Sequence, residues 1–354
     1  MNVNDGQIAG APGDAAVGGQ WIERLEALGM AVREALVEAR QSRQDMARPV
    51  ASEGGDTIFA IDRHVEPVLV HHARRWSDEL QPLWLIAEGL GRDGRMRFGP
   101  EDAPTRWAVL IDPIDGTRNV MYDKRSAWFI AAAAPMVDGR EPRLGDAVAS
   151  VMVELPASKA GWADTLTATA DGPARAWRRH LVHDERLELE VAPSAATTLR
   201  QGWAQVSNFF PGTKVLASQL MERIVTETLG PPPPGEALVF DDQYMATAGQ
   251  MAELIFGHDR FCCDLRPLFY QALEAHQGEG GGRRGLECHP YDLAGLLVAQ
   301  RAGVIVTDGF GRDLDAPMRV DAPVHWCGYA NDTLRRQIEP VIGAFLAEHG
   351  VHPV

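Results

Sequence analysis

Positive charge is scarce in this chain of 354 residues. Its 34 lysine and arginine residues, of which only three are lysines, are outnumbered by 49 aspartates and glutamates, and the formal net charge is -15. A protein of that charge repels the phosphate backbone of nucleic acids and the anionic surface of membranes. We therefore expect no nucleic-acid and no membrane partner. A phosphorylated substrate would need cations in its site to offset the repulsion.

Cysteine and long hydrophobic runs are scarce as well. The four cysteines, at 262, 263, 288 and 327, fit no zinc-binding spacing, and the adjacent pair is poorly suited to a disulfide. We expect buried free thiols in a reducing compartment. No apolar run approaches the roughly 20 residues of a membrane span, and the first residues lack the pattern of a signal peptide. These absences favour a cytoplasmic protein.

Hydrophobic periodicity divides the chain into three parts. Residues 1–19, rich in Gly, Ala and Asp, are typical of a disordered tail. Residues 20–190 form a predicted N-terminal α+β domain, with one helix from about Trp21, a second near Asp62, and then a series of β-type runs. Residues 191–354 alternate strands with helices and form a predicted C-terminal α/β domain.

The stretch WAVLIDPIDGT, residues 107–117, ends an apolar run in two acids. Five apolar residues predict a buried strand, which Pro113 should end because it has no N–H to donate. Asp112 then lies at the strand's carboxyl end, and Asp115 follows a turn that Gly116 permits. Mg²⁺ prefers carboxylate and carbonyl oxygens, including that of Ile114. Alone, the stretch is equally compatible with an ordinary Asp-Pro turn.

Three further acids lie at the ends of other apolar elements. Glu88 follows the run LWLIA, Asp62 ends GGDTIFAID, and Asp292 lies in the first turn of a predicted helix in HPYDLAGLLVAQRAG. Each has an ordinary explanation, since Asp292 could simply be a helix N-cap. Acids at four separate apolar elements together favour a common metal site.

These motifs, in this order, resemble the signatures of the inositol monophosphatase family of Mg²⁺-dependent, lithium-sensitive phosphatases. Glu88 in AEG corresponds to the first signature, DPIDGT with Asn119 to the second, and YDLAG through AGVIVTD to the third. GDTIFAIDRHVE and GYANDTLRRQI are also similar to family segments. The resemblance extends over about residues 20–345. It implies an α+β fold, a layered αβαβα sandwich of the inositol monophosphatase and sugar phosphatase type.

The resemblance also implies a set of site residues. Two or three Mg²⁺ ions would be held by Glu88, Asp112, the Ile114 carbonyl, Asp115 and Asp292. Glu88 and the Thr117 hydroxyl would orient an attacking water, with Asp112 as a bridging ligand. The backbone N–H groups of Gly116 and Thr117 would bind phosphate, and Asp62 would support the metal ligands from a second sphere. Most metal ligands would come from the N-terminal domain, and the last from the C-terminal domain.

Substrate recognition is where this chain departs from the family pattern. Gly89 replaces a second family glutamate, Tyr291 replaces a tryptophan, and the region between Asp264 and Asp292 is longer. By position, the substrate contacts implied are Thr247, Ala248 and Asp264, with Arg266 as an additional contact. Arg118 could meet a second phosphate or carboxylate, and it is equally compatible with a solvated surface arginine.

The expected activity is therefore hydrolysis of a small polyol, cyclitol or sugar phosphate by in-line attack of water. A 3'(2'),5'-bisphosphate nucleotidase and a histidinol-phosphatase-type activity remain open alternatives within the same class. From another class, a protein-interaction or regulatory factor could retain the phosphatase fold. The family resemblance further implies a homodimer.

Overall fold

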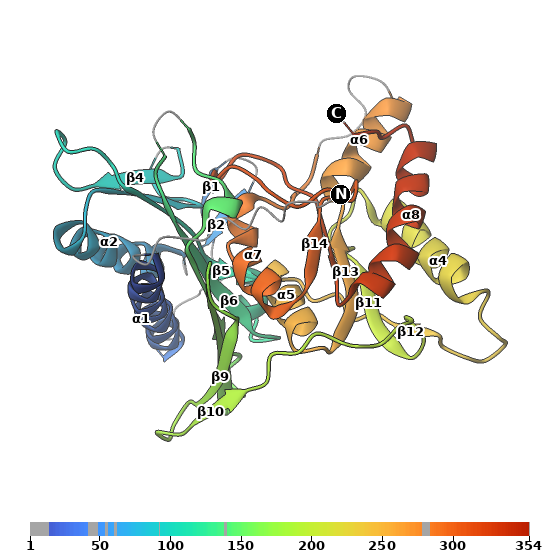
Figure 1. Ribbon diagram of the computed structural model, residues 1–354, viewed down its shortest axis with the longest axis horizontal. Helices are drawn as coiled ribbons and strands as arrows, with labels where there is room; N and C mark the ends of the chain where they lie inside the picture. The colour runs from blue at the N-terminus through green and yellow to red at the C-terminus, as the bar shows by residue number, and fades with distance from the viewer. Residues whose placement is uncertain are drawn as a thin grey trace, which may run out of the picture.

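The computed structural model describes residues 14–41, 49–53, 56–59, 62–91, 93–137, 140–277 and 284–353. For residues 14–15, 41, 49–53, 56–59, 62–63 and 276–277 it describes the backbone only. In this part of the chain, two large β-sheets alternate with three layers of helices (Figure 1). This is the α+β fold with αβαβα layering that was predicted.

The first helical layer contains α1 (Asp14–Gln41) and α2 (Asp62–Glu79). Because α1 begins at Asp14, the prediction that the tail extends to residue 19 is wrong for residues 14–19; residues 1–13 lie outside the described part. The reason is a tertiary contact, since a Cβ on Gly18 would lie 3.1 Å from the Val148 carbonyl oxygen. That approach to the sheet stabilises a helical turn whose composition favours disorder.

The larger sheet has eight strands in the order β10-β9-β8-β7-β6-β5-β3-β4. Only the β3–β5 pair is parallel among these neighbours. The strands are β3 (Leu83–Ala87), β4 (Arg95–Phe98), β5 (Trp107–Asp115), β6 (Ala127–Pro135), β7 (Ala149–Leu155), β8 (Trp162–Thr169), β9 (Arg175–His180) and β10 (Arg186–Leu189). The 3₁₀ turn η1 (Leu144–Asp146) precedes β7, and β1 (Pro49–Glu53) pairs separately with β2 (Asp56–Phe59).

The smaller sheet has five strands in the order β12-β11-β13-β15-β14. They are β11 (Gly202–Val206), β12 (Val239–Phe240), β13 (Asp259–Asp264), β14 (Ile305–Thr307) and β15 (Trp326–Tyr329). Between the two sheets lie α5 (Thr247–Ile255), the 3₁₀ turn η2 (Pro290–Leu293) and α7 (Leu296–Ala302). The outer face of the smaller sheet is covered by α4 (Lys214–Leu229), α6 (Arg266–Gln277) and α8 (Asp332–Glu348).

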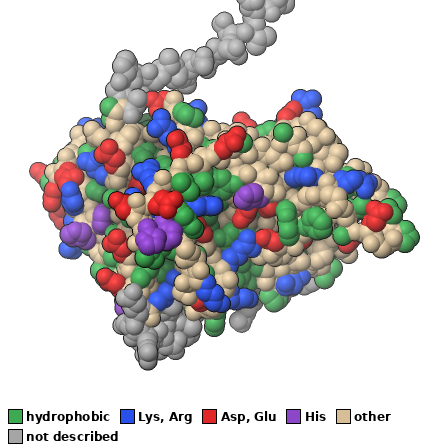
Figure 2. All heavy atoms as spheres, turned by 90° about the horizontal axis from the view of Figure 1, so that it is seen from below, with side chains coloured by type: hydrophobic (Ala, Val, Ile, Leu, Met, Phe, Trp, Pro, Cys, Tyr) green, Lys and Arg blue, Asp and Glu red, His purple; other side chains and the backbone are tan. Residues whose placement is uncertain are grey.

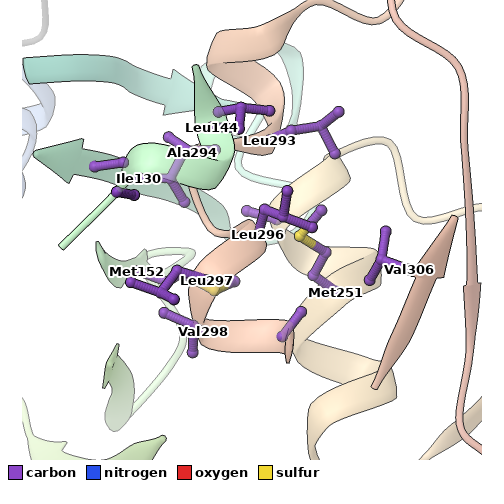
Figure 3. Packing of buried hydrophobic residues seen from close by; sticks show 14 of the residues in the cluster. Ile130, Leu144, Met152, Met251, Leu293, Ala294, Leu296, Leu297, Val298 and Val306 are labelled. Carbon is purple, nitrogen blue, oxygen red and sulfur yellow. The ribbon is translucent and has the colours of Figure 1, made fainter. Parts of the chain in front are cut away.

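Buried apolar side chains fill each space between layers. One cluster joins α1 and α2 to the larger sheet, and another joins the smaller sheet to α4, α6 and α8. The central cluster contains Met152 of β7, Met251 of α5 and Leu296 of α7 (Figure 3). The four cysteines are buried free thiols, as predicted. Among the described helices, none has both the length and the apolar character needed to cross a bilayer.

Pro113 does not end its strand, contrary to the prediction. β5 continues to Asp115, and its pairing with β6 is irregular between Asp112 and Asp115. The parallel neighbour β3 already ends at Ala87, opposite Ile111. Pro113 therefore lies in a bulge, a position that tolerates a residue without an N–H. The bulge places both aspartates at the end of the same strand.

Candidate active site

Three acidic side chains from two distant parts of the chain meet between the sheets. Oxygen atoms of Asp112, Asp115 and Asp292 all lie within 4.8 Å of one another. Asp112 and Asp115 end β5, whereas Asp292 lies in η2 and not in the first turn of an α-helix as predicted. Both aspartates of β5 are only 6% exposed.

Backbone N–H groups hold each of these carboxylates in place. The Ile114 N–H donates to Asp112 Oδ1 at 2.9 Å, and the Ala248 N–H donates to Asp115 Oδ2 at 2.5 Å. The His289 N–H donates to Asp292 Oδ2 at 2.6 Å, closing a capping box. Each carboxylate keeps lone pairs for another partner. Ala248, predicted as a substrate contact, thus supports Asp115 through its backbone.

The raised pKa values of the three acids show that bringing their negative charges together is unfavourable without a cation. Burial raises the pKa of Asp112 well above its ordinary value, and the charges of Asp115, Asp292 and Glu88 raise it further. Burial also raises the pKa of Asp115 to about 7 and, together with the charge of Asp115, that of Asp292 to about 8. Carboxylates grouped in this way fit a hard divalent cation such as Mg²⁺.

Glu88 and Thr117 lie on the same cavity as the three aspartates. Glu88 is exposed and is not one of the three acids that meet the distance given above. The Thr117 hydroxyl donates to the Ile114 carbonyl oxygen at 2.8 Å, and Thr117 begins the short helix α3 (Thr117–Met121). Its hydroxyl oxygen keeps lone pairs that can accept a hydrogen bond from a water molecule.

A turn in the left-handed region connects Asp115 to α3. Gly116 has φ 87°, and a Cβ at this position would lie 2.9 Å from the Ala246 Cβ and 3.0 Å from the Met245 carbonyl oxygen. The Asn119 side chain donates to the same carbonyl oxygen at 3.0 Å. Only glycine fits this turn without strain. The DPIDGT segment is thereby locked against the residues that precede α5.

The cavity around these acids has a volume of about 1380 Å³. Besides the acids, it is lined by Gly116, Arg118, Thr247 and Arg266 of the predicted site, whereas Asp264 and Ala248 are not on its surface. Asp264 is 0% exposed, and its carboxylate accepts hydrogen bonds from the Arg266 side chain at 2.5 to 2.9 Å. Asp264 therefore holds Arg266 and cannot itself reach a ligand. The side chain of Asp62 lies outside the part that the structure describes.

Sequence analysis missed two residues that line the cavity, Phe209 and Phe210. They follow β11 in a loop, where no period or motif marks them. His289 was assigned to core packing, but its ring stacks on that of Tyr291, with centroids 5.3 Å apart and planes 5° apart. Both rings line the cavity beside Asp292.

The sign of the surface charge varies over short distances. On the face shown in Figure 2, acidic, basic and apolar side chains intermingle. The described part contains many exposed ion pairs, among them Arg319–Asp321 and Arg336–Asp332. Exposed pairs of this kind contribute little to stability. The acids at the end of β5 are in a different environment. They are buried, so water screens their charges less.

Comparison with known proteins adds to this geometry. The sequence matches no family model and no curated protein. The fold is similar to that of the extragenic suppressor protein SuhB from Bartonella henselae, with a TM-score of 0.61 and 15% identity over 91% of this chain and 98% of that one. It is similar to the IMPase of Thermotoga maritima, with a TM-score of 0.60 and 17% identity over 94% and 100%.

A third structure with this fold is the holo form of Leishmania major fructose-1,6-bisphosphatase. Its TM-score is 0.61, with 12% identity over 95% of each chain. The chain therefore has the fold of the inositol monophosphatase and fructose-1,6-bisphosphatase structures, as the sequence motifs predicted. At these identities the likeness shows the fold alone.

Proposed function

We propose that this protein is a Mg²⁺-dependent phosphomonoesterase that hydrolyses a small polyol, cyclitol or sugar phosphate. The observation that carries the proposal is the meeting of Asp112, Asp115 and Asp292 within 4.8 Å on a cavity of about 1380 Å³. Two of the similar structures are phosphatases by name, an IMPase and a fructose-1,6-bisphosphatase. A purely structural role would not require buried carboxylates with raised pKa values on a cavity.

The metal would be held by the three aspartates, Glu88 and the Ile114 carbonyl. When bound, Mg²⁺ would offset the charge of the substrate phosphate and lower the pKa of a water molecule. The chain's own part is to orient the reactants. Glu88 and the Thr117 hydroxyl would accept hydrogen bonds from the attacking water. The backbone N–H groups of Gly116 and Thr117 would donate to the phosphate oxygens, and Asp62 would support the ligand set.

The test is phosphate release from a panel of phosphate esters, with and without Mg²⁺ and with and without Li⁺. Activity should require Mg²⁺ and fall in the presence of Li⁺. Asp112→Asn should lower kcat/KM by a factor on the order of 10³ or more, because it removes a metal ligand. The matched control is Asp321→Asn, which makes the same chemical change on the same cavity, at a residue paired with Arg319.

Two results would overturn the proposal: no ester hydrolysed in the presence of Mg²⁺, or full activity in Asp112→Asn. The first result, together with a stoichiometric protein partner in a pull-down, would favour the regulatory factor. Hydrolysis confined to nucleoside bisphosphates or to histidinol phosphate would favour the two alternatives within the class. The proposal also includes a homodimer, which sedimentation analysis would test, and no binding of nucleic acid or membranes.

A further inference from the structure

An aromatic ring on the cavity wall lies close to two arginines. The Phe210 ring centroid is 5.6 Å from the guanidinium carbon of Arg118 and 5.3 Å from that of Arg266. Arg266 also lies 5.4 Å from the Phe209 ring. All four residues line the cavity that holds the three aspartates. We call Arg118, Phe209, Phe210 and Arg266 the arginine–phenylalanine wall.

Arg266 is rigidly fixed in this wall. Its Nε and Nη2 donate to the Asp264 carboxylate, and its Nη1 donates to the Leu286 carbonyl oxygen at 2.9 Å. A guanidinium has five N–H groups, so this arrangement leaves two for another acceptor. Arg266 is only 5% exposed. A buried ion pair is weak evidence for a stabilising role, because apolar residues of similar volume often serve as well.

Arg118 reaches Phe210 from a different element of the fold. It lies in α3, three residues after Asp115, so its backbone is fixed by the same turn that positions the metal ligands. Arg266 begins α6, directly after β13. Two elements that are far apart in sequence thus bring positive charge to one ring beside the acids.

The cavity is also lined by Arg95, which lies 5.1 Å from the Trp84 ring centroid, and by three arginines in exposed ion pairs. Arg140, Arg284 and Arg319 have exposed side chains that pair with Asp146, Glu274 and Asp321 at 2.7 to 2.8 Å. Their side chains are exposed, so solvent screens their charges. In the arginine–phenylalanine wall, Arg266 is buried, so its attraction for an anion is screened less than that of the exposed arginines. Guanidinium groups also match the geometry of phosphate and carboxylate oxygens.

We propose that the arginine–phenylalanine wall binds a second oxyanion, a phosphate or a carboxylate, on the leaving group of the substrate. The preferred substrates are then phosphate esters with a second anionic group, and esters of neutral polyols are poorer substrates. This inference rests on the proposed function, because it assigns the leaving-group side of the same site. Arg118 is the specificity-determining residue, and Arg266 supports the wall with Asp264.

The experiment compares three esters that differ only at carbon 1: sorbitol 6-phosphate, 6-phosphogluconate and sorbitol 1,6-bisphosphate. With Mg²⁺, at least one of the two esters with an anionic leaving group should exceed sorbitol 6-phosphate in kcat/KM by about tenfold or more, the range of a charge-assisted hydrogen bond. The bisphosphate has two phosphates that can be hydrolysed, so its advantage must exceed about twofold to count. Which of the two esters gains identifies the oxyanion.

Substitutions then test whether the arginine–phenylalanine wall is responsible for the higher kcat/KM of esters with a second anionic group. Arg118→Gln should abolish the advantage, so that the three esters are hydrolysed with similar kcat/KM, and Arg118→Lys should retain part of it. Arg319→Gln removes the same charge from another wall of the cavity and should keep the whole advantage. Arg266→Gln is unsuitable alone, because it leaves the Asp264 charge buried and unpaired. Phe210→Leu gives a second test of the wall and should reduce the advantage.

The outcomes separate this inference from the proposed function. Equal kcat/KM for the three esters, or an advantage that survives Arg118→Gln and Phe210→Leu, overturns the inference while the phosphatase stands. Hydrolysis of sorbitol 6-phosphate alone has the same consequence. No Mg²⁺-dependent hydrolysis of any ester, in this set or in the wider panel, overturns the proposed function and this inference with it.

Discussion

Buried acidic residues occur both in the candidate site and away from it. Asp112, Asp115 and Asp292 share a site, whereas Asp259 begins β13 away from the cavity. Burial raises the pKa of Asp259 to about 7, and the charge of Glu253 adds to the shift. Gln205 Nε2 donates to its carboxylate at 3.3 Å, while Gln205 Oε1 is buried without a partner. The surroundings of Asp259 therefore favour its neutral, protonated form over the charged form.

This residue gives a pH-dependent prediction. Between its ordinary pKa and about 7, the folded state binds a proton that the unfolded state has lost, so stability falls as pH rises through this window. Asp259→Asn removes the charge, and the new amide can donate to Gln205 Oε1. At pH 8 the variant should have a free energy of unfolding higher by on the order of 1 to 3 kcal/mol.

Urea denaturation of both proteins at pH 5 and pH 8 checks this prediction. At pH 5 the difference should be smaller than at pH 8, because most of the window between the ordinary pKa and about 7 lies above pH 5. Equal stability of the two proteins at pH 8, or a gain confined to pH 5, would show that Asp259 is not held neutral by its surroundings.

At the scale of elements, α1 shows why helix propensity alone does not decide packing. A Cβ on Gly29 would lie 2.6 Å from Val153 Cγ2 and 2.7 Å from Phe129 Cδ1, whereas a Cβ on Gly19 would have nothing within 4 Å. Both glycines belong to the same helix. The helix therefore packs most closely against the larger sheet at Gly29, through its missing side chain.

The two glycines form a matched pair for mutation. Gly19→Ala should stabilise the protein by about 0.5 to 1 kcal/mol through helix propensity. Gly29→Ala should destabilise it by about 1 to 3 kcal/mol despite the same gain, because the added methyl group overpacks the core. Chemical denaturation measures both. Stabilisation by Gly29→Ala would mean that α1 is free to move away from the sheet.

The elements also show what the sequence pattern misses. The strand LWLIA was predicted with its observed bounds, Leu83–Ala87, because its apolar run is continuous. β9, with the sequence RAWRRH, was not predicted, because its arginines obscure the alternation and its pairing with β8 is a tertiary contact. The residues of helix α6 were assigned to an insertion, and no helix was predicted there. Leu268 and Ala272 are four residues apart and both buried, which is the spacing of one face of a helix.

At the scale of the whole molecule, the proposed metal site connects remote parts of the chain. Asp112 and Asp115 belong to the larger sheet, while Asp292 lies in the layer between the sheets. A cation bound to all three would stabilise the folded state, since the unfolded chain does not bring them together. The division into two domains near residue 190 remains a prediction, and the central hydrophobic cluster contains residues from both parts.

Mg²⁺ should therefore raise the midpoint of thermal unfolding. At a concentration of 100 times Kd the gain is about 2.7 kcal/mol, which corresponds to a shift of several degrees at pH 8 relative to protein in EDTA. Asp292→Asn should lose most of this shift, whereas Asp321→Asn should keep it. Scanning calorimetry provides the measurement, and a midpoint that is independent of Mg²⁺ in the wild-type protein would contradict a metal site at these residues.

The sequence by itself determined the acids of the candidate site, the order of the motifs and most strands and helices of the layered fold. These follow from local patterns: an apolar run, a period, a proline and a glycine at a turn. Only the tertiary structure decided that Asp292 meets Asp112 and Asp115, that Asp264 faces Arg266 and not the cavity, and that Phe210 lies close to both Arg118 and Arg266. The physical reason is that these contacts join residues from separate elements, and the packing of whole layers, which no local pattern encodes, sets the distances between them.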